Sequence, residues 1–172
     1  MTQKYGEEKV FSPGTVIISA AAKKKKKKKT VSPVVVNDPK STLYYIDFSF
    51  DAQKLGGSVL AQTLNRIGND VPTVQEPEYF KAAFEAIQEL IAHNFILAGH
   101  DISEGGLITA LAEMCFANSK GGLAVNLDSL AGNSIVTNLF AENPGVIIQV
   151  KDRKPVEKIL EAAGVAYAKI AV

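Results

Sequence analysis

Short apolar runs alternate along the chain with longer stretches in which apolar residues recur at helical spacing. The short runs are rich in β-branched residues and predict buried strands over 14–22, 42–48, 94–99, 146–150 and 165–171. The stretches of helical spacing predict helices over 59–67, 76–93, 107–117, 134–140 and 155–163. A further segment, 121–127, alternates like a half-buried strand. The pattern therefore predicts strands separated by helices.

This order of elements predicts an α/β (α+β) fold, in which helices pack on a sheet whose strands run in mixed directions. The chain has 172 residues, of which 47% are hydrophobic, and this suits one domain with a sizeable core. Residues 1–13 are polar and lack an apolar pattern, so we interpret them as a linker or the end of a preceding domain. The domain itself is expected to cover 14–172.

Two of the predicted helices have apolar stripes that should face the core. In 76–93 the stripe is Phe80, Phe84, Ile87 and Ile91, and in 107–117 it is Leu107, Leu111, Met114 and Cys115. Cys115 is the only cysteine of the chain, which excludes an intrachain disulfide and is typical of a reducing cytoplasm. We interpret it as a buried apolar residue, because no second cysteine supports a metal site.

A run of seven lysines, Lys23–Lys29, dominates the charge of the chain. The formal net charge is only +1, so the remaining residues are acidic on balance. Such a run normally stays solvated, because like charges repel. We interpret it as a substituted or unassigned stretch of sequence rather than as a nucleic-acid or membrane patch. No nucleic acid or membrane is therefore expected as a partner, and no apolar run reaches the ~20 residues of a membrane span.

The most informative stretch joins the predicted strand 94–99 to the helix 107–117. It places a carboxylate, Asp101, and a hydroxyl, Ser103, ahead of the glycine pair Gly105-Gly106. Ligands of open α/β sheets bind at the carboxyl ends of strands, where a helix N-terminus offers amides to an anion. A carboxylate at such a turn suggests Mg²⁺ bridging to a phosphate. The alternative is structural: Asp101 and Ser103 cap the helix while the glycines form the turn.

A second glycine pair, Gly56-Gly57, precedes Ser58 and the predicted helix 59–67. Paired glycines before a helix let backbone amides approach a phosphate, so Gly56, Gly57 and Ser58 are candidate nucleotide contacts. A plain tight turn is the alternative. His100, next to Asp101, is interpreted as a hydrogen-bonding scaffold residue, with contact to a ligand as the alternative.

Several motifs in register resemble phosphoribosylformylglycinamidine synthase, an enzyme family of purine biosynthesis. Its pattern His-Asp-x-Ser-x-Gly-Gly-Leu, followed by Glu-Met-x-Phe-Ala, is similar to 100–107 and 113–117 of this chain. The similarity continues, in constant order, at 55–58, 60–62, 84–88 and 139–145. It covers nearly the whole chain and concerns the second aminoimidazole-ribonucleotide-synthetase-type C-terminal domain of that enzyme. Glu104 is a mild departure, since the family commonly has Asp or a similar residue there.

The resemblance implies one domain of an ATP- and glutamine-dependent ligase, which converts formylglycinamide ribonucleotide to formylglycinamidine ribonucleotide. It implies Mg²⁺ and ATP or ADP as cofactors, with Asp101 as a metal ligand and Ser103 as a nucleotide contact. It implies no catalytic residue in this chain. The expected partners are formylglycinamide ribonucleotide, the N-terminal synthetase-type domains and the glutaminase domain, without which the fragment is expected to be inactive. Resemblance to the large form of the enzyme implies an auxiliary nucleotide site for Asp101 and Ser103, in which Asp101 would serve stability rather than turnover; a catalytic nucleotide site is the alternative.

Two other functions stay open. One is a non-catalytic nucleotide-binding scaffold domain whose sheet face binds a partner domain. The other is a different ATP-using member of the same superfamily, such as a selenophosphate- or thiamin-phosphate-handling enzyme. The residues at 113–117 and 140–142 favour the purine enzyme over this second alternative. With neither a secretory signal nor a membrane span in the sequence, we expect a cytoplasmic protein.

Overall fold

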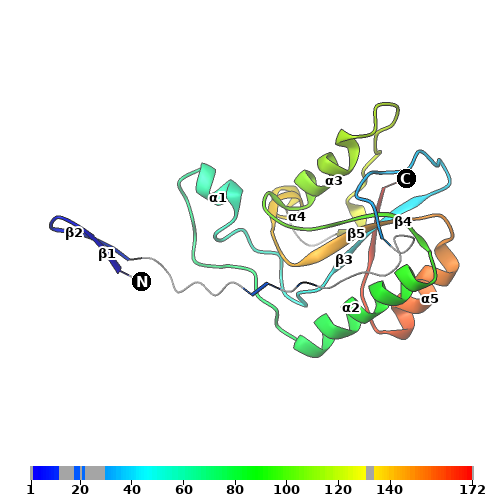
Figure 1. Cartoon of the computed structure of the whole chain (residues 1–172), viewed down its shortest axis with the longest axis horizontal. Coiled ribbons are helices and arrows are strands. Elements are labelled where there is room, and N and C mark those ends of the chain that lie inside the picture. The colour runs from blue at the N-terminus through cyan, green and yellow to red at the C-terminus, as the bar shows by residue number, and fades with distance from the viewer. Residues whose placement is uncertain (1, 12–17, 20, 22–29, 131–133, 172) are drawn as a thin grey trace.

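The computed structural model describes residues 2–11, 18, 19, 21, 30–130 and 134–171. A four-stranded sheet lies at its centre, with α2 and α5 on one face and α3 and α4 on the other (Figure 1). The predicted α/β fold class is therefore confirmed. The run Lys23–Lys29 and most of the predicted strand 14–22 lie outside the described residues; within that strand, Ile18, Ser19 and Ala21 are described and have no strand conformation.

The sheet consists of β3 (Thr42–Asp47), β4 (Ile96–Asp101), β5 (Gly145–Val150) and β6 (Ala168–Ala171), in the order β4-β5-β3-β6. Its neighbouring strands all pair antiparallel, whereas the sequence predicts mixed directions. The difference arises from the neighbour order, because β5 and β6 run in the same direction but β3 lies between them. Apolar runs identify strands without identifying their neighbours.

Helices cover both faces of the sheet and bury both sides of β3. Leu43 and Tyr45 belong to the core cluster that includes α3, and Tyr44 and Ile46 to the cluster that includes α2 and α5. The helices are α1 (Val59–Thr63), α2 (Pro77–Ala92), α3 (Gly106–Phe116), α4 (Ile135–Phe140) and α5 (Arg153–Ala162), with a 3-10 turn at Asp128–Leu130. Among the described residues, no helix is both long and apolar enough to cross a bilayer.

Two helices differ in detail from the expectation. α1 is shorter than predicted, since Asn65 beyond it has a left-handed φ of 54° and Ile67 is exposed. The buried face of α2 consists of Ala83, Ala86, Ile87 and Leu90. Phe84, which is 50% exposed, is therefore not a core residue. The predicted stripe was chosen from the large apolar side chains of the helix. In the structure, the small side chains of Ala83 and Ala86 face the sheet and let α2 approach it closely.

Residues 1–13, interpreted from the sequence as a linker or the end of a preceding domain, contain a hairpin of β1 (Thr2–Tyr5) and β2 (Glu8–Phe11). The hairpin was not predicted because its strands carry no continuous apolar run, and the interpretation of the segment stays a prediction. Two further expectations need correction. The segment 121–127, predicted as a half-buried strand, forms only one isolated bridge, from Val125 to Ala171. Cys115 is only partly buried, since it lines an open groove with Leu111 of α3 and Leu139 of α4.

Candidate functional site

The candidate site lies at the end of the sheet where β3 and β4 finish and β5 begins. The antiparallel register places Asp47, the last residue of β3, opposite Gly145, and Asp101, the last residue of β4, opposite Val146. The turn 141–144 enters β5 at this same end. The starts of α1 and α3 also approach it (Figure 1). Segments far apart in the sequence therefore meet around one turn.

Asp101 presents an exposed carboxylate at this end of the sheet. Its side chain is 77% exposed, whereas that of His100 is 17% exposed. His100 Nδ1 lies 2.7 Å from the Asp101 carbonyl oxygen, and His100 Nε2 lies 3.2 Å from Glu113 Oε2 on α3. His100 is thus a scaffold contact, as interpreted from the sequence, and most of the Asp101 carboxylate is left open to solvent.

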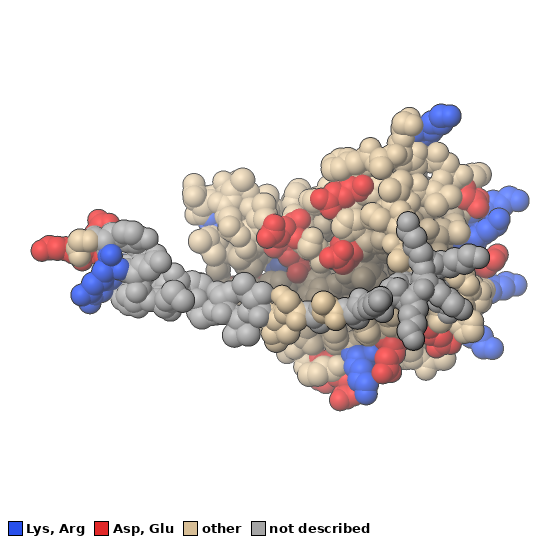
Figure 2. Space-filling view, in the orientation of Figure 1, with Lys and Arg blue, Asp and Glu red and all other residues tan. Residues whose placement is uncertain are grey.

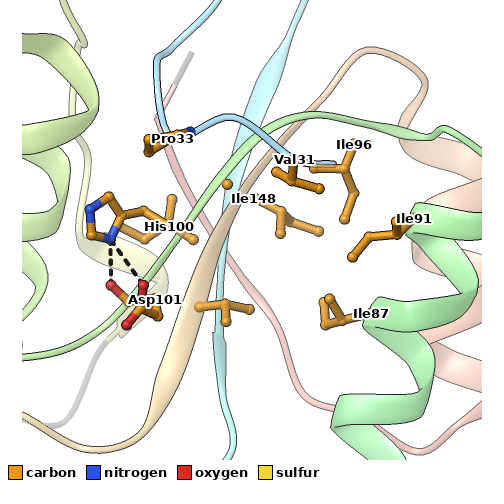
Figure 3. A pocket seen from close by; sticks show the side chains of 11 residues that line it. Val31, Pro33, Ile87, Ile91, Ile96, His100, Asp101 and Ile148 are labelled. Carbon is orange, nitrogen blue, oxygen red and sulfur yellow. Dashed lines mark hydrogen bonds and ion pairs between the residues drawn. The ribbon is translucent and has the colours of Figure 1, made fainter. Parts of the chain in front are cut away.

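An aliphatic pocket of about 400 Å³ adjoins Asp101 on the α2 side of the sheet. Figure 3 shows His100 and Asp101 together at one side of this pocket, apart from Ile87 and Ile91 of α2. The remaining lining side chains are apolar, and they come from β4, β5 and the segment around Val31. The exposed carboxylate therefore stands at the edge of an apolar surface, where the pocket offers dispersion contacts but few polar partners.

The alternative in which Asp101 and Ser103 cap the following helix is wrong. The N-cap of α3 is Gly105, which has a left-handed φ of 87° and makes no side-chain cap hydrogen bond. Ser103 contributes its carbonyl oxygen, which accepts a hydrogen bond from the Gly106 amide at 3.0 Å. Asp101 is a strand residue that precedes this turn. Neither side chain is used for capping.

The glycine loop before α1 uses its own amides internally. Gly56 donates to the Asp70 carbonyl at 2.9 Å and Gly57 to the Ile67 carbonyl at 2.7 Å. A Cβ at Gly56 would lie 2.4 Å from the Asp70 carbonyl oxygen, so the close approach of these two segments requires glycine there. These contacts agree with the tight-turn alternative. A phosphate could use the two amides only by displacing them, and their nucleotide role stays a prediction.

Ser58 is the N-cap of α1 and is almost completely buried. Its Oγ accepts from the Ala61 amide at 3.2 Å and donates to the Leu55 carbonyl at 2.7 Å. The hydroxyl therefore has partners on both sides. Its predicted contact with a nucleotide would require α1 to open.

Glu142 joins the starts of two helices, and sequence reasoning missed this role. Its Oε1 accepts from the Val59 amide at 2.9 Å and from the Gly105 amide at 2.8 Å. Val59 is the first residue of α1 and Gly105 is the N-cap of α3. A carboxylate is favourable at a helix N-terminus, where unpaired amides and the helix dipole are positive. The only sequence feature that could have pointed to Glu142 is its place within the motif 139–145.

The neighbouring Asn143 holds the loop that follows β3. Its side chain is buried, with Nδ2 donating to Ser49 Oγ at 3.0 Å and to the Ala52 carbonyl at 3.2 Å. The Lys54 amide donates to Asn143 Oδ1 at 3.4 Å. The turn 141–144 therefore contacts the loop after β3 through Asn143, and both helix starts through Glu142.

Two carboxylates, Asp47 at the end of β3 and Asp51 in the loop that follows, have pKa values shifted in opposite directions. Burial raises the pKa of the Asp47 carboxyl, with Asp51 acting in the same direction and hydrogen bonds from Ser49 opposing it. The Lys54 ammonium, 2.9 Å from Asp51 Oδ2, holds the pKa of the Asp51 carboxyl well below its usual range. Thr73 adds hydrogen bonds to the same oxygen. Lys54 and Thr73 therefore favour the ionised form of the Asp51 carboxyl at neutral pH.

The substitution Asp51→Asn should lower the free energy of unfolding at pH 7 and make that free energy fall less steeply as the pH is lowered. Because the folded-state pKa lies below the ordinary 3.8, the stabilising contribution of the carboxylate is fully present above about pH 4. It is lost as the pH falls toward the folded-state value. Urea unfolding at several pH values should show wild type and variant converging below about pH 4.

Asp47→Asn provides a control of opposite sign. The folded-state pKa of Asp47 is raised, so its protonation favours the folded state as the pH falls. Removal of this group should make the loss of stability in acid steeper. A constant difference between wild type and Asp51→Asn over the whole pH range would contradict the assignment of the Asp51–Lys54 pair.

Asp101 fits a metal only as one ligand among several. Mg²⁺ commonly takes one or two carboxylates together with phosphate oxygens and water. In the described part of the chain, no group of three His, Cys, Asp or Glu residues could hold a metal ion. An exposed carboxylate at a strand end suits an ion that is held mainly by a phosphorylated ligand. The other ligands would come from that ligand, from water and from protein outside this chain.

The fold and the site define a class: a three-layer α/β domain with an open carboxylate at one end of an antiparallel sheet. Residues 51–172 match the family described as AIR synthase related protein, C-terminal domain. The chain belongs to this family.

Curated relatives carry the name of one purine-pathway enzyme. The chain is 40% identical over 146 residues to the probable phosphoribosylformylglycinamidine synthase, chloroplastic/mitochondrial, of Arabidopsis thaliana, covering 83% of this chain and 10% of that protein. It is 35% identical over 153 residues to human phosphoribosylformylglycinamidine synthase, covering 88% of this chain and 11% of that protein. The chain thus spans about a tenth of the length of these relatives, so other domains of theirs have no counterpart in it.

Solved structures support the fold. Thermotoga maritima PurL complexed with ATP aligns with a TM-score of 0.62 at 16% identity, covering 84% of this chain and 23% of that chain. The same protein complexed with FGAR aligns with a TM-score of 0.64 at 17% identity, covering 84% and 25%. At this identity the likeness establishes the architecture alone.

Proposed function

We propose that the chain is the second synthetase-type C-terminal domain of a phosphoribosylformylglycinamidine synthase and contributes part of a metal–nucleotide site. The parent reaction would convert formylglycinamide ribonucleotide to the amidine with ATP, using glutamine as the nitrogen donor. The observation that carries the proposal is the position of Asp101. It stands exposed at the end of β4, within the motif that resembles this family and free of any capping role.

Asp101 and Ser103 are the residues proposed to meet the ligand. Asp101 would supply one carboxylate to Mg²⁺, and Ser103, exposed in the next turn, would contact the nucleotide. Gly56, Gly57 and Ser58 would contact the nucleotide only after their present hydrogen bonds open, because their polar groups are used within the loop. No residue of this chain is assigned a catalytic role.

The charge of the region favours a metal-dependent ligand over a free anion. Figure 2 shows several acidic side chains on the visible face between α1 and the rest of the domain. Asp101, Glu104 and Glu142 all belong to this end of the sheet or its following turn. Phosphates approaching these carboxylates would be repelled unless a cation intervenes. A bound Mg²⁺ would offset this charge, so nucleotide binding should require a divalent ion.

The test uses a chimaera in which this chain replaces the segment that it matches in the Arabidopsis relative. We expect the chimaera to retain Mg²⁺-nucleotide after purification and to lose it when EDTA removes the metal. The isolated 172-residue chain should fold but show no amidine synthesis with formylglycinamide ribonucleotide, ATP and ammonia, because transition-state binding needs groups from both sides of a cleft. Turnover by the isolated chain, or a folded chimaera without nucleotide, would overturn the proposal.

A non-catalytic, nucleotide-binding scaffold is the second candidate. It is favoured by the site itself, where Asp101 contacts the scaffold residue His100 and no activated nucleophile has been assigned. Asp101→Asn in the chimaera distinguishes the two roles. If the site is a scaffold, this variant should lose nucleotide and thermal stability while its turnover stays unchanged.

We also propose a reducing compartment for this protein, supported by its single cysteine. Cytoplasm is the compartment expected from the sequence, while the name of the Arabidopsis relative places that protein in chloroplasts or mitochondria. Imaging of a tagged, full-length protein in its own cells decides between these.

A further inference from the structure

A single carboxylate oxygen connects the two helix starts that border the candidate site. Glu142 Oε1 accepts from the Val59 amide at 2.9 Å and from the Gly105 amide at 2.8 Å. These donors lie 83 and 37 residues away in the sequence, so the contact links separate segments rather than one local turn. Charge-assisted hydrogen bonds of this kind are shorter and stronger than neutral ones.

The backbone around Glu142 is itself closely held. Asn143, the next residue, is buried and bonded to the loop after β3. On the other side, the carbonyls of Leu139 and Ala141 pack tightly against Gly106, where an added Cβ would approach each to 2.8 Å. The Glu142 side chain therefore projects from a turn that is held in place. Its hydrogen bonds in turn hold the amides of Val59 and Gly105.

The Gly105 end of this contact leads directly to Asp101 and Ser103. Gly105 follows Ser103 by two residues, and the Gly106 amide returns to the Ser103 carbonyl at 3.0 Å. Ile102, between Asp101 and Ser103, donates to the Gly145 carbonyl at 2.8 Å. The turn 102–105, which carries Ser103 and directly follows Asp101, is thus held at one side by β5 and at the other by Glu142.

We propose that Glu142 is a positioning residue for the metal–nucleotide site. Its Oε1 holds the start of α1 against the turn 102–105, and this contact sets the geometry in which Asp101 and Ser103 meet the ligand. The inference rests on the proposed function. It also explains how the glycine loop contributes without giving its own amides to a phosphate, because α1 shapes the site through Glu142.

Two substitutions separate the geometry of Glu142 from its charge. Both hydrogen bonds fall on one oxygen, and the amide oxygen of glutamine can accept two in the same way. In the chimaera, Glu142→Gln should therefore retain the affinity for Mg²⁺-ATP within about threefold. Glu142→Ala should lower this affinity about 10- to 100-fold, as removal of supporting contacts does at metal sites. An increase in affinity for Glu142→Gln would mean that Glu142 mainly repels phosphate, and would overturn the proposal.

Glu157→Ala is the matched control. Glu157 also accepts two side-chain hydrogen bonds, from Tyr44 and Arg153, but it lies on α5 across the sheet from α3. Its loss should lower the melting temperature without changing nucleotide affinity. If Glu142→Ala and Glu157→Ala lower affinity equally, the effect is general destabilisation and the positioning role is wrong.

Amide hydrogen exchange in the 172-residue chain supplies a readout that needs no nucleotide. The amides of Val59 and Gly105 should exchange at least tenfold faster in Glu142→Ala and near the wild-type rate in Glu142→Gln. In the chimaera, wild type should bind Mg²⁺-ATP and Asp101→Asn should not. If both hold while Glu142→Ala binds normally, the positioning proposal fails and the proposed function stands. If wild type itself binds nothing, both fail.

Discussion

Asp101→Asn should lower the affinity of the chimaera for Mg²⁺-nucleotide by about 10- to 100-fold. Even the loss of a group that only supports a metal ligand has this effect, and loss of the ligand itself should be no milder. A hard cation prefers a charged carboxylate to a neutral amide of the same shape. Nucleotide content after purification and titration with Mg²⁺-ATP measure the change.

The isolated chain is the control for this substitution. The Asp101 side chain is 77% exposed and caps no helix, so Asn should alter its stability by no more than about 0.5 kcal/mol. Thermal unfolding of the isolated variant shows whether this is so. Full nucleotide retention by the Asn chimaera would reject Asp101 as a metal ligand. If the chimaera does not fold, Asn is introduced instead at the residue of the Arabidopsis relative that aligns with Asp101.

Gly106→Ala should destabilise the isolated chain by roughly 2–5 kcal/mol and lower its melting temperature by roughly 5–15 °C. Gly106 has a φ of 73°, and a Cβ would meet the carbonyl oxygens of Leu139 and Ala141 at 2.8 Å. The first feature strains any L-residue, and the second forces the end of α4 away from α3. Urea and thermal unfolding measure the summed effect of the backbone strain and the steric clash.

Two other glycines separate these contributions. Gly164 has a φ of 66° but open space around its Cβ position, so Gly164→Ala should cost only the conformational strain, about 1–2 kcal/mol. Gly122 has open space and no positive φ, and Gly122→Ala should be close to neutral. If Gly106→Ala is no worse than Gly164→Ala, the close packing of the α3–α4 junction does not contribute.

Local patterns were sufficient to place most elements of the domain. β3, β5, α2 and α4 lie within about two residues of the predicted ranges, because burial on one or both faces imposes a period on the sequence. The hairpin at 2–11 was missed for the same physical reason, since strands that pair in a mainly polar segment carry little of that signal. The segment 121–127 has the alternation but finds only a single bridge.

The candidate site was predictable where its chemistry is contiguous. Asp101, Ser103 and the pair Gly105-Gly106 lie within six consecutive residues that begin at the end of β4, and a short motif carries that spacing. Glu142 and Asn143 were not identified as site residues, because their partners are 37 to 94 residues away. No pattern within a window of the sequence specifies such contacts.

The sequence by itself determined the α/β class, the positions of the main helices and strands, and the turn that carries Asp101. These depend on local periodicity and on residues close together in the chain. Only the tertiary structure decided that the sheet is antiparallel, that Asp101 and Ser103 cap nothing, and that Glu142 joins α1 to α3. Strand order and hydrogen bonding between distant segments depend on how the whole core packs, and local periodicity carries no record of them.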